Sequence, residues 1–189
     1  MGYWHGIANK QQAKWLDMPN DGSLDGFAKA NNLSLDALRT LKATVVLLPL
    51  NTVLGKESKA NLFPPATKGL LFSLKKGGQQ SILYEDGRER RELILESADV
   101  IFPILLCVGN AALTVVLNIL SNYLYDRFVR DKEERPSQPI QPSVRAEYVQ
   151  IDQKGTVLKW RRIEGPAKDV ARLVREESKA QAEQTGRKT

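Results

Sequence analysis

The feature that most constrains this chain is an uninterrupted run of uncharged residues from Val100 to Leu120. It is about 21 residues long, which is the length an α-helix needs to cross a hydrocarbon core of roughly 30 Å. Asp99 and Asp126 bracket the run. The run therefore predicts a membrane-spanning helix, a buried helix of a soluble fold, or a re-entrant hairpin broken at Gly109-Asn110.

The composition of the run leaves these alternatives open. Tyr123 and Tyr125 stand at its C-terminal edge, where membrane proteins carry an aromatic belt. Gly109 and Asn110 stand near its middle. An amide near a bilayer centre costs on the order of 1 kcal/mol or more, against a gain of about 0.3 to 0.6 for each large apolar residue. Insertion is therefore marginal to favourable, and nearly equal flanking basic charges leave the orientation unspecified.

A polar stripe runs along the same segment at helical spacing. Asn110, Thr114 and Asn118 are separated by four residues, and Ser121 extends the row. In a bilayer such a stripe faces another helix, because an amide facing lipid has no hydrogen-bond partner. We therefore expect these four residues to form a helix interface with protein, either a second copy or the hairpins of the same chain.

Residues 1–42 carry a helix–turn–helix pattern. Ser23 and Ser34 are suitable N-caps, and Asn32 between the two apolar helical faces tolerates a left-handed turn. The pattern predicts either a structural helical hairpin or a nucleic-acid-binding unit. In the second case the possible contact residues are Arg39, Thr40 and Lys42, although Asp36 beside them makes a poor base-reading set.

The remaining segments complete an α+β fold. Residues 43–97 are predicted to be β-rich, with a hairpin at Asp86-Gly87, a pair typical of type I′ turns. Residues 98–126 are predicted to form one long hydrophobic helix, and 127–143 a proline-rich linker. Residues 144–178 are predicted to form a ββα module, and 179–189 a disordered tail. The β-hairpins would thus flank the hydrophobic helix.

No residue pattern indicates an enzyme, a cofactor or a metal site. The "LGKES" segment differs from a phosphate-binding loop at Leu50 and Glu57. His5 is the only histidine and has no partner for a triad. Cys107 is the only cysteine, which excludes an internal disulfide and fits a reducing interior, and its apolar neighbours indicate a packing role. The N-terminus shows no apolar segment typical of a cleavable signal peptide.

The charge of the chain is compatible with an anionic partner. The formal net charge is +6 and the pI is about 9.4. Nucleic acid and acidic lipid surfaces are both permitted by this balance. The basic residues are dispersed, however, and no block of five like charges forms an arginine-rich arm.

The order of elements over residues 80–178 is hairpin, apolar helix ending "SNYLYDRF", linker, hairpin and amphipathic helix. This order resembles small accessory components of bacterial conflict (anti-phage) systems, in which a hydrophobic helix precedes a compact ββα module. The resemblance implies a non-enzymatic role that depends on a partner, and it assigns no functional residue.

We therefore expect a non-enzymatic interaction component, associated with the membrane as a single-pass or peripheral protein. It would act through helix-mediated self-association or a partner protein, with an acidic lipid surface as a further partner. The alternative is a cytoplasmic, soluble regulator that binds nucleic acid through residues 23–42.

Overall fold

The computed structural model describes residues 12–52, 58–94, 99–130 and 142–186. Their centre is a six-stranded mixed sheet with the strand order β1-β8-β7-β6-β2-β4. Strands β6 and β7 are parallel, as are β2 and β4, and the other pairs are antiparallel. The α+β class is confirmed. The strands of this sheet are β1 (Lys14–Asp17), β2 (Val45–Leu48), β4 (Ser81–Leu83), β6 (Val100–Val108), β7 (Ser143–Ile151) and β8 (Val157–Pro166).

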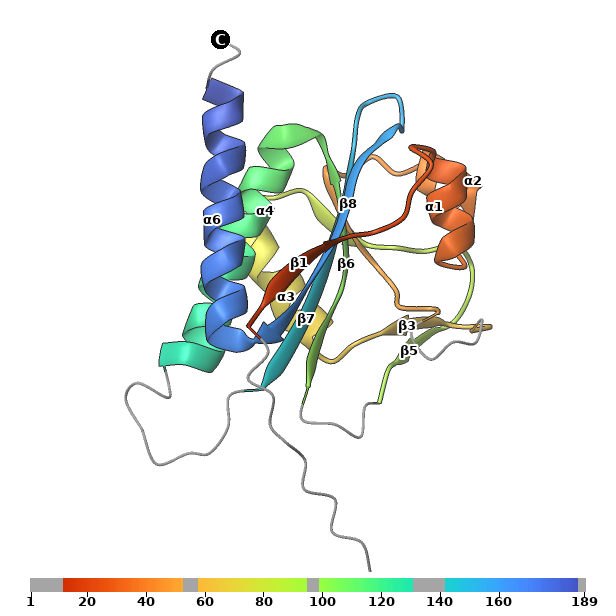
Figure 1. The fold of residues 1–189 in the computed structure, drawn as a ribbon. Coiled ribbons are helices and arrows are strands. Elements are labelled where there is room, and N and C mark those ends of the chain that lie inside the picture. Colours follow the sequence, from red (N-terminus) through yellow and green to blue (C-terminus); the bar gives the residue numbers. More distant parts are fainter. Residues whose placement is uncertain (1–11, 53–57, 95–98, 131–141, 187–189) are drawn as a thin grey trace, which may run out of the picture.

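Helices cover the two faces of the sheet unequally (Figure 1). Three longer helices pack on one face, which we call the helix face: α3 (Ala66–Lys76), α4 (Gly109–Leu124) and α6 (Ala167–Gly186). A six-residue π-helix, η1 (Tyr125–Arg130), continues α4. The opposite face, which we call the short-element face, carries α1 (Leu24–Ala30), α2 (Leu35–Arg39) and a two-stranded parallel sheet of β3 (Asn61–Phe63) and β5 (Arg90–Glu92).

The single hydrophobic helix predicted for residues 98–126 is wrong. The run is divided into strand β6 and helix α4 at Gly109, which has a φ of +81°. β6 pairs with β2 and β7 and is buried on both faces, so it reads as continuously apolar, as central strands do. Pro103 is tolerated in this strand because the pairing with β7 shifts register between Ile101 and Ile104.

The division of the run into β6 and α4 also affects the prediction of a membrane-spanning helix. In the described part of the chain, no helix combines the length and the apolar character that a membrane crossing requires. α4 has 16 residues and therefore rises only about 24 Å, short of a core of roughly 30 Å. The single-pass expectation is therefore not supported.

The predicted hairpin at Asp86-Gly87 is also wrong, because β4 and β5 belong to different sheets. β4 pairs with β2, and β5 pairs with β3. A type I′ turn needs positive φ at both central residues, and only Gly87 has it. The Asp86 side chain is instead turned inward, where it accepts hydrogen bonds from Tyr84, Asn61 and Arg88.

Two other predicted units are present. The helical hairpin α1–α2 begins at Ser23 and Ser34, whose hydroxyls accept from Gly26 N and Ala37 N. Asn32 between the helices has a φ of +51°. Within residues 1–42, however, 14–17 form strand β1 beside β8. The module β7–β8–α6 also forms as predicted.

The segments around this module differ from their predicted bounds. Residues 131–141 of the predicted linker lie outside the described residues, and its first part is η1. Helix α6 continues through Gly186, so most of the predicted disordered tail is helical. The reason is that its inner side remains packed: Ser178 and Gln181 are both buried, and their side chains are hydrogen-bonded.

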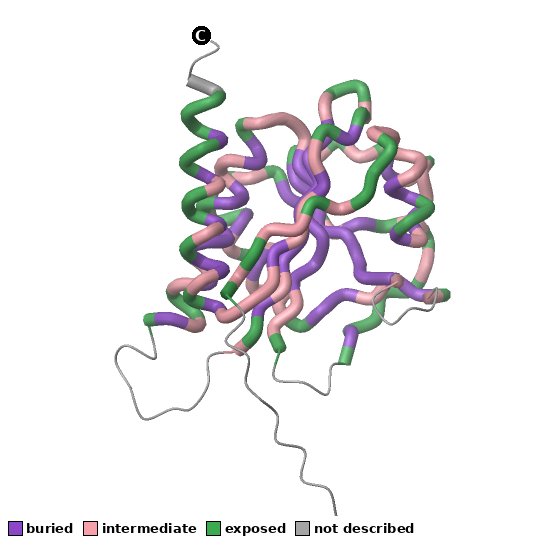
Figure 2. The backbone as a smooth tube through the Cα atoms, in the orientation of Figure 1, coloured by how far each residue is buried: buried purple, intermediate pink, exposed green. Residues whose placement is uncertain are grey.

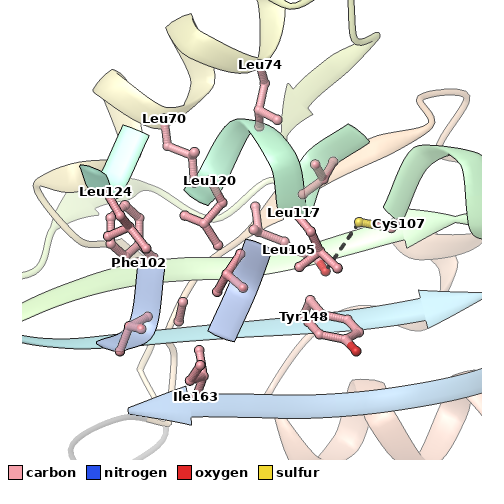
Figure 3. Packing of buried hydrophobic residues seen from close by; sticks show 14 of the residues in the cluster. Leu70, Leu74, Phe102, Leu105, Cys107, Leu117, Leu120, Leu124, Tyr148 and Ile163 are labelled. Carbon is pink, nitrogen blue, oxygen red and sulfur yellow. Dashed lines mark hydrogen bonds between the residues drawn. The ribbon is translucent and has the colours of Figure 1, made fainter. Parts of the chain in front are cut away.

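The core lies in two layers on either side of the sheet, and buried residues concentrate there (Figure 2). On the helix face, Leu70 and Leu74 of α3 and Leu117 of α4 meet Leu105 of β6 and Tyr148 of β7 (Figure 3). The inner sides of the three helices are thus buried in the core, so only their outer sides can contact a binding partner.

Candidate functional site

The polar stripe predicted as a helix interface is largely used within the chain. The Ser121 hydroxyl is buried and donates to the Ala171 carbonyl of α6 at 3.0 Å. The Thr114 carbonyl accepts from Ser178 at 2.9 Å, and Asn110 accepts from the Gln150 amide of β7. Asn118 is exposed. Self-association through this stripe stays a prediction, and Asn118 is its one exposed member.

The predicted nucleic-acid contacts Arg39, Thr40 and Lys42 are all exposed at the end of α2. α2 has five residues and is therefore about 7.5 Å long, which is short for a helix that reads base edges. The Thr40 hydroxyl already donates to the Ala37 carbonyl at 2.9 Å. The structure brings these residues together without forming a continuous basic surface around them.

Arg39 does line a groove of about 480 Å³ at the carboxyl ends of β6 and β7. Such strand ends are a common place for ligands in α/β sheets. The charged residues of this groove are two acidic and two basic: Asp25, Asp152, Arg39 and Lys154. Asp152 is held by the backbone N–H groups of Lys154 and Thr156, which lower its pKa. With balanced charge, the groove has no preference for an anion.

A buried polar network ties the short-element face together. Asp86, whose side chain is 4% exposed, accepts from Arg88, from Asn61 and from the Tyr84 hydroxyl. Burial raises the pKa of Asp86, but the hydrogen bonds from Arg88 and Asn61 outweigh it and lower the value to about 2. Arg88 also donates to the Asn32 carbonyl at 2.6 Å. Each charge here has a partner, so the network indicates a structural role.

A second, partly buried carboxylate, that of Glu177, holds α6 to the sheet. Its oxygens accept from the Tyr148 hydroxyl at 3.0 Å, from Lys159 at 3.1 Å and from Arg161 at 3.0 Å. Gln181 donates to it from the next turn of α6. Burial opposes ionisation of Glu177, yet the hydrogen bonds lower its pKa overall. This cluster is closed as well, and it leaves no free base or nucleophile.

The remaining reactive groups are the single cysteine and the residue types that bind metals. Cys107 is buried in the helix-face core, and burial raises the pKa of its thiol to about 12. His5 lies outside the described residues. Among the residues that are described, no three of the His, Cys, Asp and Glu side chains gather as metal ligands.

The outer side of α3 carries an exposed aromatic residue between lysines. Phe72 is 69% exposed, and Lys68 and Lys75 lie one helical turn to either side. We call Lys68, Phe72 and Lys75 the α3 face. The prediction that residues 43–97 are β-rich missed this set of residues. The signal was present as the spacing i, i+4 and i+7 of these three residues.

Beside the α3 face lies an open groove of about 640 Å³ between the end of α3 and η1, which we call the α3–η1 groove. Three basic side chains and one acidic side chain line it, giving a net charge of about +2. Arg130 pairs with Asp126 at 3.3 Å, whereas Lys76 and Arg127 have no ion pair with any of the described residues. The lining residues are Ser73, Lys76, Gly77, Ile119, Asn122, Tyr123, Asp126, Arg127 and Arg130.

Close packing of α3 on α4 forms the floor of this groove. A Cβ on Gly77 would lie 2.5 Å from the end of the Ile119 side chain, and one on Gly69 would lie 2.6 Å from the Tyr123 hydroxyl. The two glycines therefore allow the helices to approach closely. The basic side chains that line the groove come from the end of α3 and from η1.

Comparison with protein-family models, with curated proteins and with solved structures gave no match to this chain.

Proposed function

We propose that this protein is a non-enzymatic binding component that associates peripherally with acidic lipid surfaces through the α3 face. The observation that carries the proposal is Phe72, a large apolar side chain that is 69% exposed between two lysines. An apolar side chain within a basic helical face is the arrangement of interfacial helices, which insert the apolar group at the headgroup boundary. The closed polar clusters elsewhere support a role in binding.

The expected strength is modest. Four basic side chains can approach the same surface: Lys68, Lys75, Lys76 and Arg127. Each contributes about 1 kcal/mol near an acidic leaflet. Burial of Phe72 adds about 2 kcal/mol. A total near 6 kcal/mol corresponds to a dissociation constant on the order of 10⁻⁵ M. Binding of this strength is reversible and depends on ionic strength, because it is largely electrostatic.

Charge distribution favours α3 over the groove that contains Arg39. The groove that contains Arg39 has two acidic and two basic residues, so it gains nothing from an anionic surface. The α3 face has no acidic residue of its own, and Asp126 beside it is already paired with Arg130. The α3 face and the groove next to it therefore combine positive charge with an apolar group.

Co-sedimentation with vesicles tests the proposal. We expect the protein to bind vesicles of phosphatidylglycerol in low salt and to be released by about 1 M salt. It should not bind vesicles of phosphatidylcholine. The double substitution Lys68→Glu/Lys75→Glu should abolish binding. Its matched control is Lys154→Glu/Lys179→Glu, which makes the same charge change at exposed positions distant from α3 in the chain.

Two results would overturn the proposal. One is equal loss of binding in the two charge-reversed proteins, which would indicate a non-specific effect of net charge. The other is displacement of the protein from vesicles by duplex DNA at equal phosphate concentration, together with tighter binding to DNA than to lipid. That result would favour the nucleic-acid alternative.

A further inference from the structure

We propose that the α3–η1 groove is a specific site for a phosphate monoester group. The inference rests on the proposed function only in taking a lipid headgroup as the source of that phosphate. A soluble phosphate monoester presents the same chemistry, and the experiment below separates the two sources.

Two cations without an ion pair among the described residues give the site its charge preference. Lys76 and Arg127 line the groove from α3 and from η1, and neither forms an ion pair with another described residue. The third cation, Arg130, is held by Asp126 at 3.3 Å. The net charge of about +2 matches a phosphate monoester, which carries about −1.5 to −2 near pH 7. A diester carries a single charge and satisfies only one of the two cations.

Neutral hydrogen-bonding groups line the same space. The Asn122 side-chain oxygen accepts from Arg175 at 3.4 Å, which leaves its NH₂ group as a donor. The Tyr123 side chain lines the groove next to it. An arginine, a lysine and an amide are the groups that bind phosphate oxygens by charge-assisted and neutral hydrogen bonds.

The position of the groove fits a lipid source. Lys76 of the groove lies one helical turn after Phe72 of the α3 face on the same helix. A headgroup phosphate seated between Lys76 and Arg127 would therefore lie beside the point where Phe72 enters the bilayer. The apolar Ile119 lines the groove and packs against the helix-face core.

The test compares vesicles of phosphatidic acid, a monoester, with vesicles of phosphatidylglycerol, a diester, at matched surface potential. We expect about tenfold tighter binding to phosphatidic acid, as an additional charge-assisted hydrogen bond would give. The substitution Lys76→Gln/Arg127→Gln should remove this preference while leaving weaker binding to both vesicles. Both side chains are exposed, so the fold should persist. Phe72→Ala should weaken binding to both vesicles equally and keep the preference.

The second arm uses glycerol 3-phosphate without vesicles, followed by shifts of the Asn122 side-chain amide in NMR spectra. Saturable shifts would support the site if the substitution Lys76→Gln/Arg127→Gln abolishes them. If these shifts occur but the protein does not bind vesicles, the source of the phosphate is a soluble ester and the proposed function is rejected. Equal affinity for the two vesicle types with no shift by glycerol 3-phosphate overturns the site and leaves peripheral binding intact. Tighter binding of a single-stranded oligonucleotide to the same residues also overturns it.

Discussion

The two faces of the sheet are covered by different means. The helix face carries helices of 11, 16 and 20 residues whose inner sides join one apolar cluster. The short-element face carries helices of seven and five residues and strands of three. Helices this short are unstable alone. Extended apolar packing therefore holds one face, whereas the other face also needs a polar network around Asp86.

The difference extends to the connections within each layer. On the short-element face, Arg88 reaches back 56 residues to the Asn32 carbonyl, and Asn32 donates to Ser58 across 26 residues. On the helix face, α4 directly follows the strand it packs on, and α6 directly follows β8. The helices are thus fixed by their inner sides, and the outer side of α3 remains free to bind.

The largest expected effect is loss of packing on the helix face. Leu117→Ala should lower the free energy of unfolding by about 3 kcal/mol, because Leu117 is fully buried and a cavity would remain. Chemical denaturation measures this change. The loss should be global, so amide exchange should accelerate on both faces. Faster exchange confined to α4 would contradict the view that this cluster supports the whole fold.

A comparable but localised effect is expected from Arg88→Ala. The substitution leaves the Asp86 carboxylate buried without its charged partner, which should cost about 2 to 3 kcal/mol. Amide exchange should accelerate mainly in α1, α2 and β3, because the Arg88 side chain ties these elements together. The matched control is Arg91→Ala, which removes an exposed ion pair with Glu89 and should change stability by less than about 0.5 kcal/mol. Equal effects of the two substitutions would refute the proposed role of the network.

Acid should weaken the polar network around Asp86. The pKa of Asp86 is about 2 in the folded protein, below the ordinary value of 3.8. A carboxyl with a depressed folded pKa stabilises the fold above its unfolded pKa, and this contribution disappears as the pH falls through the folded value. Denaturation measured from about pH 5, roughly one unit above the ordinary value, down to about pH 2, the folded value, should therefore show a loss of about 2 kcal/mol. Asp86→Asn should flatten that part of the profile, and an unchanged profile would contradict the assignment.

The smallest effects concern the polar stripe of α4. Ser121→Ala should cost about 1 kcal/mol, because it leaves the buried Ala171 carbonyl without its donor. Asn118→Leu should change stability by less than about 0.5 kcal/mol, because Asn118 is exposed. Sedimentation velocity of Asn118→Leu also tests the predicted self-association. A shift in oligomeric state would support an interface at the stripe. No shift is expected if the stripe contacts only α6 and β7 of the same chain.

Local signals explain which parts of the fold could be predicted. The caps Ser23 and Ser34 and the left-handed Asn32 act within a few residues, so the helical hairpin was visible in the sequence. The run from Val100 to Leu120 was wrongly predicted as one helix, because a strand buried on both faces and a helix packed on a sheet are both uncharged. Only Gly109 marked their boundary.

Long-range pairing explains what could not be predicted. The bond between Arg88 and the Asn32 carbonyl joins positions that no periodicity relates. The α3–η1 groove joins Lys76 with Arg127, and their proximity depends on how α3 crosses α4. By contrast, the residues of the α3 face have helical spacing in the sequence, but the segment 43–97 that contains them was predicted to be β-rich.

The most direct test of the account measures the affinity for phosphatidylglycerol vesicles after Phe72→Ala and after Leu158→Ala. Both side chains are large, apolar and exposed, at 69% and 55%, but only Phe72 lies among basic residues on α3. We expect Phe72→Ala to weaken binding by at least about tenfold, from the loss of about 2 kcal/mol of apolar burial. Leu158→Ala should leave the affinity unchanged. Equal affinities of the two variants and the unaltered protein would contradict the claim that the α3 face is the binding surface.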